Sequence, residues 1–509
     1  MPHFCPSDRL QSEDAAFLYL ETKEAPLHIG SVSIFDGAIP IEECVEYIES
    51  RLPLIPRYRQ RIVVPPFHVG HPTWEHDPTF DIHNHVHYVR LERGAQADLE
   101  YFAGETFAEM MDRTRPLWDM TIVDGLDHGR CALISRVHHC LVDGVSGVGL
   151  MNVILDPTLK APKRSKKRFS HAPALPDPGS SLVDALASSY SEVLEQILSA
   201  QTAALEMAQA LVSNQAVRGF DQLVRLVPEL LTPVERLPFN KPCLGPRKVA
   251  WTEISIPEVS AVRQACGGTL NDVVLTVVTT AVRRYSALHG ASVKNRLLRL
   301  MVPVNLRRDG NHNGLGNLVS VLPVSVPLDI RDPLKLLDAI HHRTEALKHA
   351  HVADLIHLLA TWMGTTPAPL QALLGPLATL LQVPPFNMVC TNVPGPQLPL
   401  YALGRKMLTY YPYVPIGGDM ALDCAIQSYN QKLYFGLTAD AAAAPDVARL
   451  RNFLDDAFAR LKKAAGVGAS EPSTLKPEAD FTEHLGEVYK EVGPPATLKT
   501  HGGKAAIYS

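Results

Sequence analysis

The stretch CALISRVHHCLVDG, residues 131–144, runs from an apolar pattern into a pair of histidines and a short polar segment. A second apolar stretch, WDMTIVDGL at residues 118–126, precedes it, and Gly129 lies in the short connection between the two. Two such runs with a glycine between them predict a hairpin of two strands. The second strand therefore leads directly into His138 and His139.

The histidine pair opens the pattern HHxxxDG, which ends in Asp143 and Gly144. Successive side chains of a strand point to opposite faces, so one imidazole can face a channel while the other packs inward. Asp143 is near enough to brace the local turn or to pair with a distant arginine. Gly144 permits a close approach that a Cβ atom would block.

This combination of residues suits the formation of an ester. A neutral imidazole takes the proton of an alcohol while the oxygen attacks a thioester carbonyl, and nearby donors stabilise the oxyanion. No serine nucleophile is needed when both substrates are bound together. The alternatives are a pair of structural histidines or a metal site. No third histidine or carboxylate stands at a recognisable ligand spacing, so we predict no metal.

Length and composition limit the number of domains, the class of partner and the cellular compartment. A chain of 509 residues is too long for one hydrophobic core and indicates two or more domains. A net charge of -5 argues against nucleic-acid binding. The eight cysteines form no CxxC pair and are expected to be free thiols in a reducing compartment. With no apolar leader and no apolar run of about 18 residues, we expect a cytoplasmic protein, with membrane-surface attachment left open.

Strand and helix patterns alternate in two blocks, which predicts an α/β arrangement built twice. The first block is residues 1–160 and carries HHxxxDG; the second is residues 246–465. Between them, residues 161–245 begin as a basic, proline-rich linker and continue as a helical crossover. Residues 466–509 are rich in Gly, Pro, Lys and Glu, and we expect them to be disordered.

Individual elements can also be predicted. A helix is expected near the start, with Ser12 as its N-cap. In the second block the pattern predicts helices over residues 260–267, 271–290 and 445–463, and strands over residues 297–306, 318–328, 386–395 and 432–440.

At the level of motifs, HHCLVDG matches the HHxxxDG motif of the coenzyme A-dependent acyltransferase superfamily, which includes chloramphenicol acetyltransferase and peptide-synthetase condensation domains. Flanking motifs narrow the resemblance to the bacterial-type wax ester synthase/diacylglycerol acyltransferases. They occur in family order over about residues 7–463: SEDAAFLYLET, PLHIGSVSIF, PTWEHDPTFDIHNHV, PLW, LNDVVL, MVPVNLR, GLGNLVS, TNVPGP and SYNQKLYFGLTAD.

The resemblance implies two domains of the chloramphenicol-acetyltransferase type with the active site in a channel between them. His139 would be the general base and His138 would support it. Asp143 would be structural and paired with an arginine, for which Arg307 is a candidate. The substrates would be a fatty acyl-coenzyme A and either diacylglycerol or a long-chain alcohol, with no metal or prosthetic group.

Two further motifs have both a structural and a functional interpretation. Asn271 and Asp272 open a helix, where Thr269 or Asn271 can cap the backbone, and Asn271 can also line the channel opposite His139. Trp118 of the PLW motif can pack in the core or stand at the mouth of an acyl channel.

The TNVPGP motif follows an apolar strand. Its proline and glycine are typical of a turn, whereas Thr391 or Asn392 can donate a hydrogen bond to the oxyanion.

Two other functions remain open at this stage. One is an acyltransferase that uses another hydroxyl or a carrier-protein substrate, and the other is a non-catalytic scaffold of lipid inclusions. The basic run near residues 160–168 and the apolar residues 219–231 and 355–385 are candidates for peripheral contact with a membrane or lipid inclusion.

Overall fold

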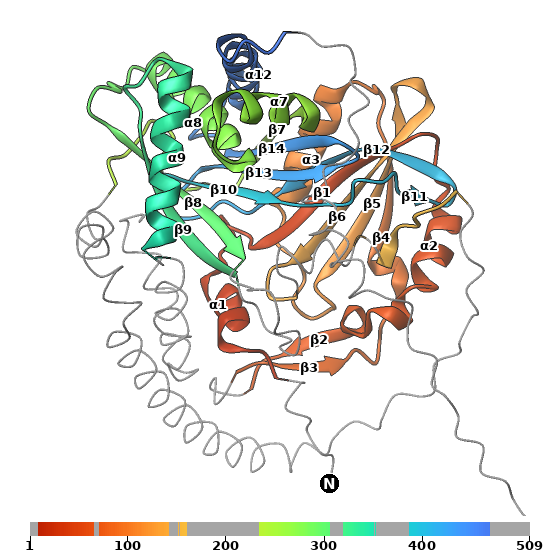
Figure 1. Cartoon of the computed structure of the whole chain (residues 1–509). Helices are drawn as coiled ribbons and strands as arrows, with labels where there is room; N and C mark the ends of the chain where they lie inside the picture. The colour runs from red at the N-terminus through yellow and green to blue at the C-terminus, as the bar shows by residue number, and fades with distance from the viewer. Residues whose placement is uncertain are drawn as a thin grey trace, which may run out of the picture. The chain divides into compact units, whose positions relative to one another are not determined.

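The computed structural model describes residues 9–65, 71–141, 151, 153–159, 234–305, 319–350, 352 and 386–468 (Figure 1). The chain divides into two units, Met1–Gly468 and Ala469–Ser509, and every described residue belongs to the first. The predicted crossover helices, the apolar residues 355–385 and nearly all of the predicted tail lie outside the described residues.

The predicted hairpin is confirmed. Strands β5 (Trp118–Leu126) and β6 (Arg130–His138) pair antiparallel, with Trp118 opposite Val137. The connection places His128 and Gly129 at φ 64° and 68°, and glycine adopts such angles without steric cost. Strand β6 ends at His138, so the histidine pair stands where regular pairing stops.

This hairpin belongs to a sheet in the order β11-β12-β1-β6-β5-β4. The other strands are β1 (His28–Phe35), β4 (Val86–Arg90), β11 (Tyr401–Ala402) and β12 (Arg405–Tyr413). Helices α2 (Ile41–Glu49) and α3 (Gln96–Ala108) contribute buried residues to the same core. Helix α1 (Ser12–Leu20) and the two-stranded sheet of β2 (Gln60–Val63) and β3 (Thr73–His76) complete this part.

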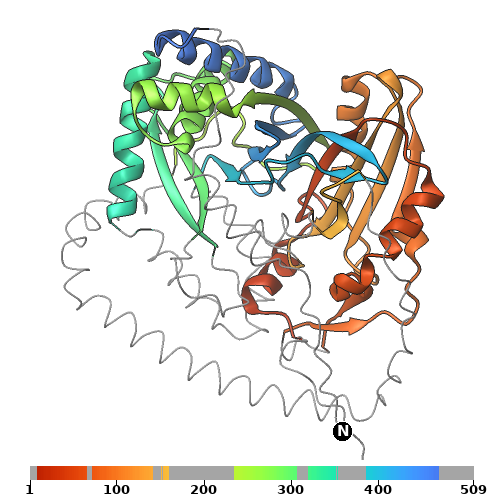
Figure 2. The ribbon, with the colours of Figure 1, turned by 45° about the vertical axis from the view of Figure 1, so that its right-hand side comes forward.

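Strands β11 and β12 come from the C-terminal part of the sequence, yet they extend the N-terminal sheet. Strand β12 pairs antiparallel with β1, with Gly30 opposite Tyr413. Figure 2 shows this blue ribbon reaching the red and orange strands. Helix α3 also approaches the second sheet closely, because a Cβ atom on Gly104 would lie 2.6 Å from the Arg247 carbonyl oxygen. The two predicted blocks therefore share a sheet.

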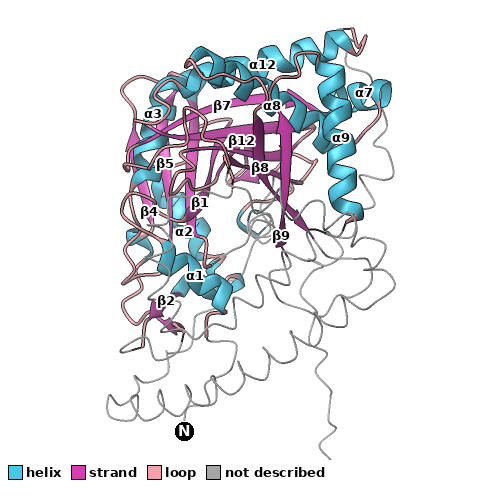
Figure 3. Ribbon diagram, turned by 90° about the vertical axis from the view of Figure 1, so that its left-hand side faces the viewer, coloured by secondary structure: helices cyan, strands magenta, loops and turns pink. Residues whose placement is uncertain are grey.

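The second sheet has the order β7-β14-β13-β10-β8-β9. Its strands are β7 (Arg247–Ser255), β8 (Leu297–Asn305), β9 (Val319–Pro327), β10 (Met388–Val393), β13 (Leu422–Tyr429) and β14 (Lys432–Asp440). Strand β10 runs parallel to both of its neighbours. Helices α7 (Ile256–Cys266), α8 (Leu270–Leu288), α9 (Pro333–His349) and α12 (Val447–Ala464) share one core with this sheet (Figure 3).

Most element predictions in this part agree with the structure to within a few residues. Helix α7 begins at Ile256 rather than at the predicted residue 260, because Pro257 suits a first turn that needs no amide donor. The prediction that Ser12 caps α1 is wrong. Gln11 holds the extended N-cap conformation, and Ser12 is already helical.

Two sequence expectations can be compared with the described part of the chain. The seven cysteines within it are free, as expected. No single helix there is long and apolar enough to cross a membrane, although α7 and α8, bent by 99° at their junction, pass such a test as a pair.

Candidate active site

The two histidines at the end of β6 have different surroundings, as strand alternation predicts. His138 has no exposed surface, whereas His139 is partly exposed. Nδ1 of His138 accepts the backbone N–H of Cys140 at 3.2 Å. Because an N–H group can only donate, a neutral His138 carries its own proton on Nε2. That nitrogen faces the Oε1 atom of Glu21 at 3.4 Å.

Glu21 is the residue that connects His138 to helix α1. Its Oε1 accepts the Leu27 N–H at 2.8 Å, and its Oε2 accepts bonds from Arg113 Nε at 3.1 Å and Nη2 at 2.7 Å. Burial raises the pKa of Glu21, but contacts with His138, Arg113 and Leu27 outweigh it and lower that pKa to about 2. The carboxylate is therefore ionised at neutral pH.

His139 is held from two sides. Its backbone N–H donates to the Leu27 carbonyl at 3.0 Å. Its ring stacks on Phe17, with 3.9 Å between the centroids and 10° between the planes. The Nδ1 atom of His139 is buried. Neither Phe17 nor Glu21 was among the predicted site residues. The signal for them was the family motif SEDAAFLYLET, which contains both.

A third histidine lies beside this pair. His28 of β1 stands directly opposite His138 and has no exposed surface. Burial, followed by the nearby charges of Arg136 and His138, lowers its pKa well below the ordinary value. Its ring lies 5.6 Å from that of Tyr413, and neither of its nitrogens has a hydrogen-bond partner in the described structure. His28 is thus a buried, uncharged neighbour of His138.

The second group of predicted residues lies at the start of α8. Thr269 and Asp272 form a capping box: Thr269 Oγ1 accepts from the Asp272 N–H at 3.2 Å, and Asp272 Oδ2 accepts from the Thr269 N–H at 2.8 Å. Asp272 also lies 3.0 Å from His341 Nδ1 and accepts from Thr344 at 2.8 Å. Burial raises the pKa of Asp272, but these hydrogen bonds lower it overall. The predicted capping by Thr269 is confirmed.

Asn271 turns toward β10. Asn392 Nδ2 donates to its Oδ1 at 3.4 Å, so the structure brings these two predicted residues together. Thr391 Oγ1 accepts the Ile426 N–H at 3.4 Å. Among the described residues no hydrogen bond joins this group to His139, and the predicted channel between the groups stays a prediction. Asp143, Gly144 and Arg307 lie outside the described residues.

Comparison with known proteins identifies the chain. Residues 10–274 match the wax ester synthase/diacylglycerol acyltransferase catalytic domain, and residues 315–462 match the C-terminal domain of the same family. The chain belongs to this family. It is therefore an acyl-coenzyme A-dependent acyltransferase, as the resemblance of its motifs implied.

Relatives and solved structures agree with this family. Two Mycobacterium tuberculosis proteins, tgs1 and tgs2, are each named a probable diacylglycerol O-acyltransferase. The first is 29% identical over 472 residues, 89% of this chain and 96% of its own length. The second is 29% identical over 473 residues, 90% of this chain and all of its own.

A solved wax ester synthase/diacylglycerol acyltransferase from Marinobacter aquaeolei covers 90% of this acyltransferase and all of its own chain, with a TM-score of 0.61 and 24% identity. The first condensation domain of the CDA synthetase has a TM-score of 0.55 and 14% identity, with 90% of this chain and 97% of its own covered. These two likenesses establish the fold, which is of the predicted chloramphenicol-acetyltransferase type.

Trp118 lies in the core of the acyltransferase. Only 2% of it is exposed, and its Nε1 donates to the Tyr58 carbonyl at 2.8 Å. Its ring stacks between Tyr58 and His85, 4.6 Å from each. These contacts account for the residue by packing, and its placement at a channel mouth stays a prediction.

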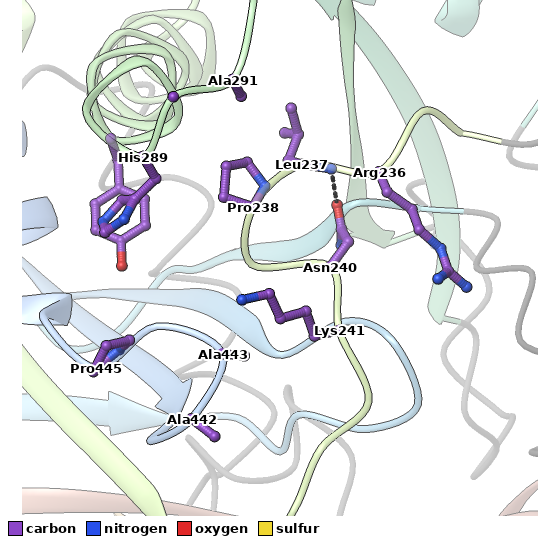
Figure 4. Close-up of a pocket in the computed structure, with 12 residues that line it drawn as sticks. Arg236, Leu237, Pro238, Asn240, Lys241, His289, Ala291, Ala442, Ala443 and Pro445 are labelled. Carbon is purple, nitrogen blue, oxygen red and sulfur yellow. Dashed lines mark hydrogen bonds between the residues drawn. The ribbon is translucent and has the colours of Figure 1, made fainter.

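A separate pocket of about 540 Å³ lies in the C-terminal part of the acyltransferase. Figure 4 shows Asn240 in the loop between Arg236 and Lys241, with His289 at the nearby helix end. None of the predicted site residues lines it. Among the described residues, no group of three or more His, Cys, Asp or Glu side chains could hold a metal ion.

Proposed function

We propose that this chain transfers a fatty acyl group from acyl-coenzyme A to the hydroxyl of diacylglycerol, with a long-chain alcohol as a second acceptor. The observation that carries this proposal is the different environment of the two histidines. His138 is buried with its Nε2 atom 3.4 Å from Glu21, while His139 is partly exposed. The names of the mycobacterial relatives support diacylglycerol as the acceptor.

In the proposed reaction His139 is the general base. Its Nδ1 is buried, so Nε2 is the nitrogen we assign to the proton transfer. Nε2 takes the hydroxyl proton as the acceptor oxygen bonds to the thioester carbonyl carbon. The tetrahedral intermediate then collapses, the carbon–sulfur bond breaks, and the imidazolium returns the proton to the leaving thiolate. The products are an ester and free coenzyme A, with no metal or prosthetic group involved.

We assign the oxyanion donor to the end of β10. Thr391 already accepts a backbone N–H, and its own hydroxyl proton is left to donate. The Asn392 amide donates to Asn271 instead, so this asparagine pair orients the strand end. Asp143 would brace the turn after the histidines through an arginine such as Arg307, and Gly144 would allow the substrate close to the backbone.

The acceptors are apolar, so we propose a cytoplasmic enzyme that works at the surface of a membrane or lipid inclusion. Support comes from the sequence, where a basic run near residues 160–168 and the apolar residues 219–231 and 355–385 have the composition of surface-binding segments.

The deciding experiment compares His139→Ala with the parent enzyme on palmitoyl-coenzyme A. Dioleoylglycerol and hexadecanol are tested separately as acyl acceptors, and an acyl-carrier protein is tested as an alternative substrate. We expect turnover to fall by about 10²- to 10⁴-fold, the range for loss of a general base. His83→Ala is the matched control, because that side chain is 73% exposed in the same half. A folded His139→Ala enzyme with parental turnover would refute the assignment of the base. If the parent enzyme forms no ester with either acceptor, the alternative of a non-catalytic scaffold is favoured.

A further inference from the structure

Helix α1 reaches the histidine pair with two side chains that are four positions apart. Residues at this spacing share one face of a helix. Phe17 stacks on His139, and Glu21, directly after the helix, contacts His138. One short element thus contacts each of the two rings through a different kind of side chain.

The Phe17 ring lies nearly flat on the His139 ring, with 3.9 Å between the centroids and 10° between the planes. The neutral pair Phe107 and Tyr413 has the same geometry, 3.9 Å and 9°, so the separation by itself does not report a charge. A cation on a ring face is attracted by the negative charge of the π-system. The face of Phe17 is therefore placed where it stabilises an imidazolium once His139 has taken a proton.

We propose that Phe17 is a positioning residue for acyl transfer: its ring sets the plane of the His139 imidazole and stabilises the positive charge that His139 acquires on taking the proton. This inference rests on the proposed function, in which His139 is the base. Phe17 acts through His139 and covers one face of its ring. Reactants then approach through the plane of the imidazole, where its nitrogen lone pair lies.

Among the described residues, other ionisable groups also lie near the histidine pair. They are Asp14 of α1, Glu21 directly after it, His28 of β1, His138 of β6, and the neighbouring Arg113 and Cys140. A Phe17 variant leaves these residues in place, and the matched variant described below tests whether a shift in the pH profile comes from the Phe17 ring.

The test measures kcat/KM against pH for the full chain with palmitoyl-coenzyme A and dioleoylglycerol. Phe17→Leu keeps an apolar side chain but removes the π-face. A pentafluorinated phenylalanine at position 17 keeps the size and reverses the charge of the face, so it serves even if the leucine variant folds poorly. Without the π-face, His139 should protonate less readily. We expect the acidic limb to move to lower pH by about half a unit, with about fivefold slower turnover on the plateau.

Phe80→Leu is the matched control. Phe80 is also partly buried in the N-terminal part and stacks on a histidine, His85, at 5.3 Å and 17°. This variant should lose a similar amount of packing and leave the acidic limb where it was. An unmoved limb in both Phe17 variants, or an equal shift in Phe80→Leu, would overturn the inference. If His139→Ala abolishes turnover while the limb stays in place, only this inference fails. If His139→Ala remains active, the proposed function itself fails.

Discussion

The histidine end of β6 and the asparagine contact between α8 and β10 are held in different ways. His138 is anchored by an ionised carboxylate, Glu21, whose pKa is held at about 2 by its neighbours. Asn271 and Asn392 are neutral, and the adjacent charge of Asp272 is engaged in a helix cap. The N-terminal group thus surrounds the ring that we propose as the base with charged and aromatic side chains, whereas the C-terminal group presents neutral dipoles. Four measurements test this contrast.

Of these four, the largest effect on turnover is expected from Thr391→Val, which removes the proposed oxyanion donor and keeps the shape of the side chain. Loss of one such donor costs about 10²- to 10³-fold in kcat, and KM should change little because the charge develops only in the transition state. Steady-state kinetics of purified enzyme measure both. Thr279→Val, in the buried part of α8, is the control and should keep parental kcat. Equal kcat for Thr391→Val and parent would remove Thr391 from the chemistry.

A smaller effect on turnover, about tenfold, is expected from Glu21→Gln. The amide keeps the shape but removes the negative charge that contacts Arg113 and faces His138. Glu21 is buried, whereas the Arg113 side chain is 39% exposed and stays solvated in the variant, so we expect a loss of about 1.5 to 3 kcal/mol of stability, the range for hydrogen bonds to charged groups. Urea unfolding measures that loss. Glu43→Gln is the control: the Glu43 carboxylate is 53% exposed in its pair with Arg405, so this change should alter stability by less than about 0.5 kcal/mol. Similar losses in the two variants would contradict a special place for Glu21.

The pH dependence of stability offers a check on the same carboxylate. Glu21 has a folded pKa of about 2, below its ordinary value of 4.5. A depressed carboxyl pKa stabilises the folded state above the unfolded pKa, and this contribution is lost as pH falls toward the folded pKa. Between about pH 4.5 and pH 2, the free energy of unfolding should therefore fall more steeply in the parent than in Glu21→Gln. Parallel curves would mean that the ion pair contributes nothing.

The smallest effect on turnover is expected from Asp272→Ala, which should instead lower the stability of the folded state. The variant loses the capping box and one of the two acceptors of the Thr344 hydroxyl, which keeps only the His341 carbonyl at 3.0 Å. We expect about 2 kcal/mol less stability from the cap and the unmade hydrogen bond together. The rate per folded molecule should stay within about twofold of the parent. A loss of turnover as large as that of Glu21→Gln would show that Asp272 takes part in the chemistry.

Local patterns in the sequence were enough for much of the fold. The hairpin that ends in His138 follows from two apolar runs around Gly129, and α8 follows from its apolar spacing and the Thr269 cap. Such features depend on neighbours within a few positions. The burial of His138 and the partial exposure of His139 also fit the two-residue repeat of a strand.

Contacts between distant residues were not predictable in this way. The pairing of β12 with β1 joins residues far apart in the sequence, and both strands have the same local pattern as strands of an ordinary neighbouring pair. Glu21 and Phe17 read as ordinary residues of a helix until α1 is placed against the end of β6. Trp118 illustrates the same difficulty, since only its packing between Tyr58 and His85 distinguishes a core residue from one at a surface.

The α/β class, the strand that carries the histidine pair and the acyltransferase family can all be predicted from the amino-acid sequence, because they depend on short-range periodicity and on motifs in order. Which groups surround each imidazole is visible only in the folded chain. That choice is made by burial and strand register across the whole chain, which bring an ionised carboxylate to one ring and an aromatic face to the other.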